Sequence, residues 1–202
     1  MKITNILIGG VCMLTLAACN DYLDVDVPSK SSNEDIYTSE TETSLALNEV
    51  YAKALTDNTF GNMAYNNMLL NSDVDFSAKA DEVAQLNAPR RFDCTAESSD
   101  TEKFWNALYS GVETANNFIY NLENSEMYST ENANLTQMLG EAKVLRAMFY
   151  YELLCYWGDI PFSLLPTFVT QEFILPITSR DEVYKQLIAD LEGIAPLMKT
   201  TA

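Results

Sequence analysis

The side chains best suited to binding chemistry gather between residues 57 and 98, in a stretch rich in asparagine, aspartate, serine and alanine. Aromatic rings offer flat apolar faces on which a sugar ring can stack, while carboxylates and guanidinium groups hydrogen-bond to hydroxyls. Function also concentrates in loops. The predicted ligand patch therefore consists of Tyr65, Asp73, Asp75, Phe76, Arg90, Arg91 and Phe92.

The acidic residues of this stretch allow two further interpretations. Asn71, Asp73, Asp75, Ser77 and Glu82 stand at the ligand positions of a calcium loop like that of the EF-hand. Phe76, however, occupies the sixth position, where a glycine makes the sharp turn. Asp73 and Asp75 could also serve a glycosidase, but a sequence does not show the separation across a cleft that such a pair needs. We therefore favour a solvated acidic loop, with no metal and no catalytic residue.

Composition argues against catalysis and against nucleic acid as a partner. The 202 residues contain no histidine, which excludes Ser-His-Asp and Cys-His machinery and removes the commonest zinc ligand. No Cys-x-x-Cys pair, glycine-rich phosphate loop or nucleophile elbow is present. The formal net charge of −17 is opposite to the basic surface that phosphate binding requires. We expect a binding protein that is not an enzyme and needs no cofactor.

The N-terminus has the layout of a lipoprotein signal. Residues 1–18 comprise a lysine near the start, a mostly apolar stretch too short to span a bilayer, and Ala17 and Ala18 directly before Cys19. Cleavage before Cys19 would expose its thiol for lipid attachment, and two or more acyl chains make a stable anchor. An ordinary signal peptide with a chance cysteine is the alternative. Residues 19–38 are then an acidic, lipidated tether, and residues 39–202 form the folded domain.

Two cysteines remain in the mature chain. Cys155 lies in an apolar helical stretch and Cys94 in a polar loop, so we favour two free thiols. Export from the cytoplasm also permits a disulfide between them, and that alternative stays open.

The elements that must position the ligand patch are helices. Apolar residues recur at spacings of three and four in four segments, approximately 40–56, 99–122, 132–157 and 179–195. Ser39, Ser99 and Ser179 each precede a glutamate by three residues, as in a capping box. Gly158 and Pro161 end the third helix. The long connection after the first helix predicts a short helix near residues 61–70. The fold class is therefore all-α.

Each predicted helix has an apolar face assigned to the core. The faces comprise Leu47, Val50, Tyr51, Ala54 and Leu55 in the first helix; Trp105, Leu108, Tyr109, Val112, Asn116, Ile119 and Leu122 in the second; Leu135, Met138, Leu139, Ala142, Leu145, Phe149 and Leu153 in the third; and Val183, Tyr184, Leu187, Ile188, Leu191 and Ile194 in the fourth. The helical aromatic residues, with Phe118, Tyr150 and Trp157, are predicted to pack rather than to bind a ligand.

The third helix carries a longer pattern. Residues 140–151 read GEAKVLRAMFYY and residues 157–161 read WGDIP, and together they resemble the signature of the SusD/RagB family of outer-membrane nutrient-binding lipoproteins. The segments CNDYLD at 19–24, WNALYSGVETAN at 105–116 and RDEVYKQLIADL at 180–191 resemble other parts of that family in the same order. The resemblance covers essentially the whole mature chain.

The resemblance implies a fold of tetratricopeptide-like helix pairs and a surface-facing lipoprotein of the outer membrane. Such a protein would capture oligosaccharides, or in some members peptides, for import through a SusC-like TonB-dependent transporter. Members of the family are considerably longer than 202 residues, so we expect this chain to be an N-terminal portion. No binding residue is carried over, because no specific motif marks one here.

Two alternatives to nutrient capture remain open. One is a lipid-anchored helical scaffold that binds another protein, as tetratricopeptide-like surfaces often do. The other is a truncated family member without function, whose uncovered apolar faces would favour association. A neighbouring gene for a TonB-dependent receptor would favour nutrient capture over both.

Overall fold

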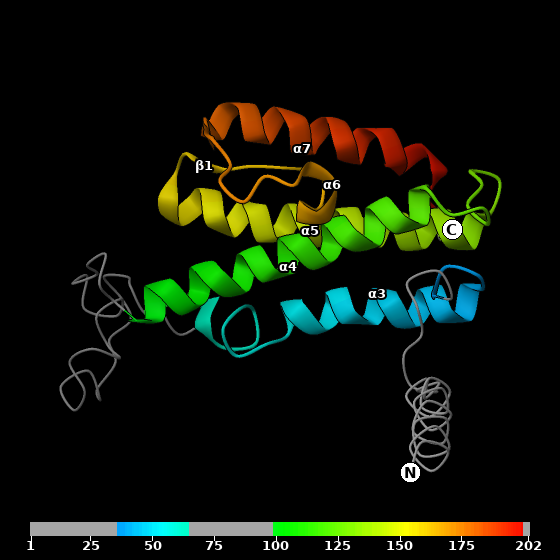
Figure 1. The fold of residues 1–202 in the computed structure, drawn as a ribbon, viewed down its shortest axis with the longest axis horizontal. Coiled ribbons are helices and arrows are strands. Elements are labelled where there is room, and N and C mark those ends of the chain that lie inside the picture. Colours follow the sequence, from blue (N-terminus) through cyan, green and yellow to red (C-terminus); the bar gives the residue numbers. More distant parts are fainter. Residues whose placement is uncertain (1–35, 65–98, 200–202) are drawn as a thin grey trace, which may run out of the picture. The chain divides into compact units, whose positions relative to one another are not determined.

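The computed structural model describes residues 36–64 and 99–199. Long helices dominate this part of the chain (Figure 1), which confirms the mainly helical fold class. In chain order the elements are α3 (Glu40–Ala54), α4 (Ser99–Glu123), α5 (Ala133–Trp157), β1 (Ile160–Pro161), α6 (Thr167–Thr170), β2 (Ile177–Thr178), α7 (Arg180–Ile194) and the 3-10 turn η3 (Ala195–Leu197). The two short strands pair antiparallel, with Ile160 opposite Thr178.

The helix ends follow local sequence signals. The side chains of Ser39 and Ser179 accept hydrogen bonds from the backbone N–H groups three residues later, and Asn132 does the same at the start of α5. Gly158 ends α5 with φ 73°, a conformation that costs glycine little. Helix α3 ends at Ala54, two residues earlier than expected, where the buried hydroxyl of Thr59 donates to the Ala54 carbonyl.

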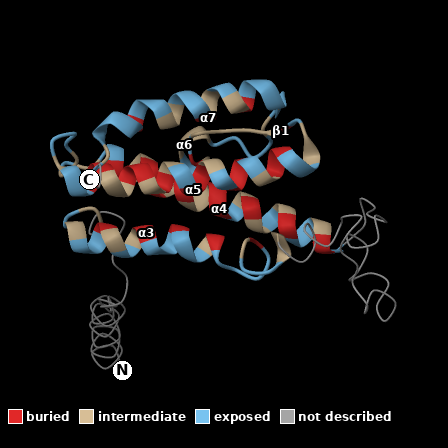
Figure 2. Ribbon diagram, turned by 180° about the vertical axis from the view of Figure 1, so that it is seen from behind, coloured by how far each residue is buried: buried red, intermediate tan, exposed pale blue. Residues whose placement is uncertain are grey.

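The core lies between α4 and α5, and α3 and α7 pack against this pair. Helix α4 contacts α5 along much of its length, α3 contacts both of them, and α7 contacts α5 (Figures 1 and 2). Leu108, Phe149 and Leu153 are completely buried at this contact. Burial of such a side chain stabilises the fold by about 1.5–3 kcal/mol. The central position of α4 and α5 explains why their apolar faces are predicted best.

The outer helices bury less than their apolar patterns indicate. Tyr51 and Leu55 were expected in the core, but they are 37% and 71% exposed, because α3 packs through the narrower stripe of Leu47, Val50 and Ala54. Ile188 of α7 is 54% exposed, since α7 contacts few elements besides α5. Cys155 has a free, exposed thiol, so its apolar setting in the sequence did not indicate burial.

A buried arginine joins α4, α5, α7 and the chain after β1. The guanidinium of Arg146 donates to Asn116 Oδ1 at 2.7 Å, to the Leu164 carbonyl at 3.0 Å and to Asp190 Oδ2 at 2.6 Å. Arg146 is 2% exposed. A buried charge is tolerated only when it is paired and hydrogen-bonded, so these partners must assemble together.

Several predictions fall outside the described residues. Cys19, the tether up to residue 35, Cys94 and most of the helix expected at residues 61–70 belong to this group. Within residues 36–64 and 99–199, no helix combines the length and apolar character needed to cross a bilayer.

Candidate functional site

All seven residues of the predicted ligand patch, from Tyr65 to Phe92, lie outside the described residues, so the patch stays a prediction. The described residues instead present two grooves, which lie on either side of α5. We name them the polar groove, between α3 and α5, and the apolar groove, between α5, α7 and Phe60. No cluster of three or more histidine, cysteine or acidic side chains in the described ranges could hold a metal ion.

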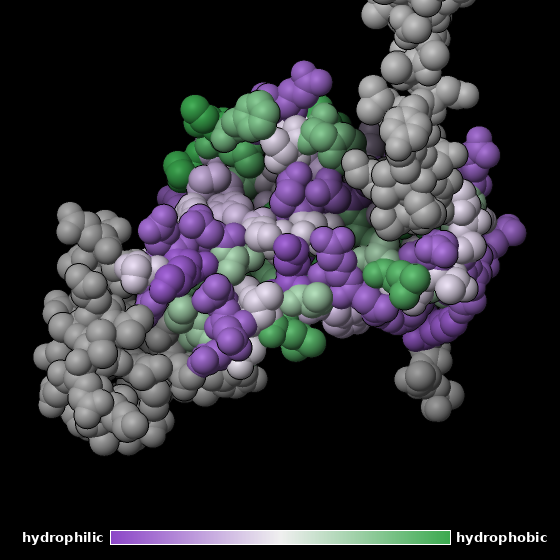
Figure 3. All heavy atoms as spheres, turned by 60° about the horizontal axis from the view of Figure 1, so that its bottom comes forward, coloured by the Kyte–Doolittle hydropathy of each residue, from purple (hydrophilic) through white to green (hydrophobic). Residues whose placement is uncertain are grey.

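The polar groove has a volume of about 590 Å³. Its lining combines carboxylate, amide and hydroxyl groups with a tyrosine ring, a lysine and three aliphatic side chains, and comprises Glu40, Thr41, Ser44, Leu45, Leu47, Asn48, Tyr51, Asn134, Gln137, Met138, Glu141 and Lys199. Figure 3 shows a face on which hydrophilic side chains predominate and hydrophobic ones form separate patches.

Hydrogen bonds across the polar groove tie α3 to α5. The Tyr51 hydroxyl donates to Glu141 Oε2 at 3.0 Å. Within α5, Gln137 Nε2 holds the same carboxylate by donating to Glu141 Oε1 at 3.0 Å. Asn134 Nδ2 donates to Glu40 Oε2 at 2.7 Å. Hydrogen bonds from Asn132 and Asn134 lower the pKa of Glu40, because they favour its charged form. Both carboxylates of the groove are therefore already engaged.

Other polar groups of this groove remain available to a ligand. Thr41, Ser44 and Asn48 have no side-chain hydrogen-bond partner among the described residues. Together with Tyr51 they recur at helical spacing on one face of α3. A partly exposed ring beside free hydroxyl and amide groups can stack on a sugar and bond to its hydroxyls. This face was not expected from the sequence, because the apolar spacing of α3 assigns Tyr51 to the core.

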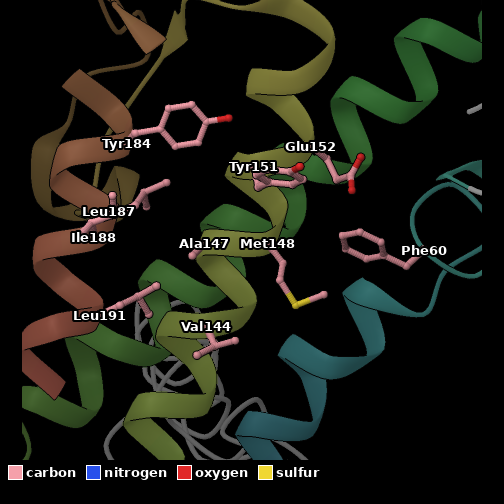
Figure 4. A pocket seen from close by; sticks show the side chains of 10 residues that line it. All are labelled: Phe60, Val144, Ala147, Met148, Tyr151, Glu152, Tyr184, Leu187, Ile188 and Leu191. Carbon is pink, nitrogen blue, oxygen red and sulfur yellow. The ribbon is translucent and has the colours of Figure 1, made fainter. Parts of the chain in front are cut away.

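The apolar groove has a volume of about 470 Å³ and a different lining (Figure 4). Figure 4 shows the α7 side chains along one side, the α5 side chains in the middle and Phe60 on the other side. The lining comprises Phe60, Val144, Ala147, Met148, Tyr151, Glu152, Tyr184, Leu187, Ile188 and Leu191. Such a surface could not satisfy the many hydroxyls of a sugar, because unpaired polar groups are costly to desolvate.

Glu152 is the one acidic side chain that lines the apolar groove. It is half-buried and has no hydrogen-bond or ion-pair partner in the described part of the chain. Burial raises the pKa of its carboxyl, because the charged form loses hydration. The groove therefore combines an apolar floor with one uncompensated negative charge.

A cluster of aromatic rings joins the N-terminal part of α4 to the end of α5. The Trp105 ring centroid lies 4.9 Å from Trp157 and 4.7 Å from Tyr109. The Tyr109 hydroxyl donates to the Pro161 carbonyl at 2.6 Å. Both tryptophans are only half-buried, although we expected them to pack. Their edge contacts stabilise the helix pair, in keeping with the packing role.

The sequence of this chain is similar to those of known proteins along almost its whole length. A sequence model of the SusD-like family, described as "Starch-binding associating with outer membrane", matches residues 21–200. A SusD-like protein of Formosa agariphila is 23% identical over 199 residues, which cover 95% of this chain and 37% of that relative. The chain thus spans little more than a third of the length of this curated relative.

Solved structures share the fold. A SusD-like protein from Bacteroides fragilis superposes with a TM-score of 0.69 at 21% identity, over 85% of this chain and 32% of that one. Surface glycan-binding protein A from Bacteroides fluxus gives a TM-score of 0.63 at 26% identity, over 78% of this chain and 33% of that one. Because the family's sequence pattern extends over residues 21–200 of the 202 residues, this protein belongs to the SusD-like family.

Proposed function

We propose that this chain is part of a non-catalytic, lipid-anchored protein that binds oligosaccharides at the outer-membrane surface. The single observation that carries the proposal is the family match over residues 21–200, whose description names starch binding and the outer membrane. The glycan-binding protein of Bacteroides fluxus, with the same fold, supports the same class of ligand. Peptides are the alternative class of nutrient.

The proposed binding residues are those of the ligand patch, Tyr65, Asp73, Asp75, Phe76, Arg90, Arg91 and Phe92. Their chemistry supports the assignment, because rings and charged planar groups together serve both faces of a sugar. The polar groove is the second candidate, since it offers the free groups of Thr41, Ser44 and Asn48 next to Tyr51.

The proposed partner is a SusC-like TonB-dependent transporter, which would import the captured glycan. The proposed anchor is the lipid on Cys19, and the acidic tether that follows it favours a position facing the cell exterior. A scaffolding role is the competing function, and one observation favours it: the apolar groove is suited to a protein helix rather than to a sugar.

Glycan binding and membrane anchoring can be tested together, with cells that express the chain and with the purified protein. Cells that carry the intact chain should bind labelled oligosaccharides at their surface. Cys19→Ala should release the chain from the membrane fraction without loss of binding in solution. Phe92→Ala should weaken binding at least about tenfold, equal to about 1.4 kcal/mol. The matched control is Asn48→Ala in the polar groove, which should bind normally.

The pattern of results separates the candidates. If Asn48→Ala weakens binding and Phe92→Ala does not, the site is the polar groove. If the purified chain binds no oligosaccharide from a broad panel, the proposed function is wrong. Retention of Cys19→Ala in the membrane fraction would refute the lipid anchor.

A further inference from the structure

The chain between β1 and α6 is held in place by side chains of other elements. Four carbonyls of residues 161–165, which we call the connecting segment, accept hydrogen bonds from side chains; they belong to Pro161, Ser163, Leu164 and Leu165. The donors all lie on α4 or α5, and they are Tyr109, Asn116, Arg146 and Tyr150. Backbone groups that form no ladder need such partners when they leave water. The place of the connecting segment therefore depends on α4 and α5.

Arg146 bonds to the connecting segment and to α7 through different nitrogens. Its Nη1 donates to the Leu164 carbonyl at 3.0 Å and to Asn116 Oδ1 at 2.7 Å. Its Nη2 donates to Asp190 Oδ2 at 2.6 Å. Asp190 Oδ1 in turn accepts a hydrogen bond from Lys143 Nζ at 2.9 Å. Because the guanidinium is buried, water does not replace a partner that it loses, and the loss is costly.

The start of this region is also joined to the start of α7. Asp159 Oδ1 accepts a hydrogen bond from the backbone N–H of Arg180 at 2.9 Å. Strand β1 pairs with β2, which directly precedes α7. Helix α7 itself packs on α5 and makes little contact with α4. The network around Arg146 is therefore the main polar connection between α4 and α7 in the described part of the chain.

We infer that the connecting segment and α7 open and close as one cooperative unit, which Arg146 couples. Native proteins open locally in units of this kind, which often coincide with supersecondary motifs. Figure 1 shows α7 on the side of the α4–α5 pair opposite α3, so the unit opens without breaking the α3 contacts. Opening of either part takes a partner from the buried guanidinium, and this cost favours opening of both together.

Separate attachment of the two parts is the competing arrangement. In that case α7 would be held by its buried apolar side chains, such as Val183 and Leu187, which are 0% and 5% exposed. The connecting segment would be held by its own hydrogen bonds, such as those of Tyr150. A substitution that loosens the segment would then leave α7 unchanged, whereas coupling through Arg146 transmits the effect.

Native-state hydrogen exchange of the intact chain, followed in peptides from α7 and α3, tests the inference. Asn116→Ala removes bonds to Arg146 and to the connecting segment, but none to α7. It should accelerate exchange in α7 at least about tenfold and leave α3 unchanged. The matched control is Asn121→Ala, since Asn121 also lies on α4 but donates to the Asn117 carbonyl, outside this network. It should not change exchange in α7.

A milder variant covers the case in which Asn116→Ala fails to fold. Tyr150→Phe keeps the buried ring and removes only the hydroxyl, which bonds to the carbonyl and the N–H of Ser163 at 2.7 and 3.2 Å. Exchange in α7 should again accelerate. Because coupling between two sites is reciprocal, Asp190→Asn should accelerate exchange at the Ser163 and Leu165 amides.

Three results would overturn the inference. The first is faster exchange in the connecting segment alone after Asn116→Ala or Tyr150→Phe, which would show separate attachment. The second is an equal acceleration in α3 and α7, which would show that the whole helical domain opens rather than one unit. The third is a response of α7 to Asn121→Ala as large as that to Asn116→Ala.

Discussion

The two sides of α5 handle polar groups in opposite ways. Towards α3, carboxylates and amides lie at the surface and bond to one another across the polar groove, as Tyr51 does to Glu141. Towards α7, the polar contacts lie beneath the surface, where Arg146 and Lys143 bind Asp190, and the outer side chains are apolar. The same helix therefore has one hydrated contact and one that exposes apolar surface to water.

The two contacts of α5 differ in how much their polar groups contribute to the stability of the fold. Exposed hydrogen bonds contribute little net free energy, because water competes for each group. The buried Arg146–Asp190 pair contributes little as a pair, yet loss of one partner leaves an uncompensated charge inside the protein. We therefore expect substitutions of the buried polar residues between α5 and α7 to destabilise the protein strongly. The apolar side chains above them are available for binding. Substitutions in the α3–α5 contact should be tolerated.

The largest expected effect comes from breaking the buried pair. Asp190→Ala should lower the free energy of unfolding by about 3–5 kcal/mol, because Arg146 would remain charged and buried. Urea denaturation measures the loss. Glu123→Ala is the control, since this partner of Lys143 is 40% exposed and should contribute about 0.5 kcal/mol. Equal losses in the two variants would show that the α5–α7 contact is no more sensitive than an exposed one.

A smaller effect is expected on the polar side. Tyr51→Phe removes the 3.0 Å hydrogen bond to Glu141 and should cost about 0.5–1 kcal/mol, because the pair is exposed to solvent. Thermal unfolding of Tyr51→Phe and Tyr151→Phe provides a matched comparison, since Tyr151 lies in the apolar groove and is 54% exposed. A larger loss from Tyr151→Phe would contradict the assignment of polar bonding to the α3 side.

The smallest expected effect depends on pH. Burial raises the folded-state pKa of Glu152, so the folded protein holds this proton more tightly than the unfolded chain. Stability should then fall as pH rises from the ordinary glutamate range through the raised pKa, and the deficit persists at neutral pH. Glu152→Gln lacks this deficit.

Urea denaturation at pH 7 should therefore give Glu152→Gln a free energy of unfolding higher than that of the wild-type chain. The difference should be less than about 0.5 kcal/mol, because solvent screens a half-exposed carboxylate. The gain should vanish below pH 4. Glu172→Gln, at an exposed position outside both grooves, should show no such trend. If the stability advantage of Glu152→Gln over the wild-type chain grew as the pH fell, burial would not be what raises the pKa of Glu152.

Local signals predicted the helices and their family well. The caps at Ser39 and Ser179 and the stop at Gly158 act through backbone hydrogen bonds within a few residues, so they can be read from sequence. The apolar faces of α4 and α5 were predicted closely because these helices are covered on several sides. The polar groove was missed, since its residues meet only when α3 packs on α5.

By itself, the sequence determined the helical fold class, most of the helix ends and the membership of the SusD-like family. These features depend on periodicity and on contacts close in the chain. Only the tertiary structure decided that Tyr51 and Ile188 face solvent and that Asp190 pairs with Arg146. Periodicity shows that a helix has an apolar face. Which part of that face is covered depends on neighbours that the chain brings from a distance.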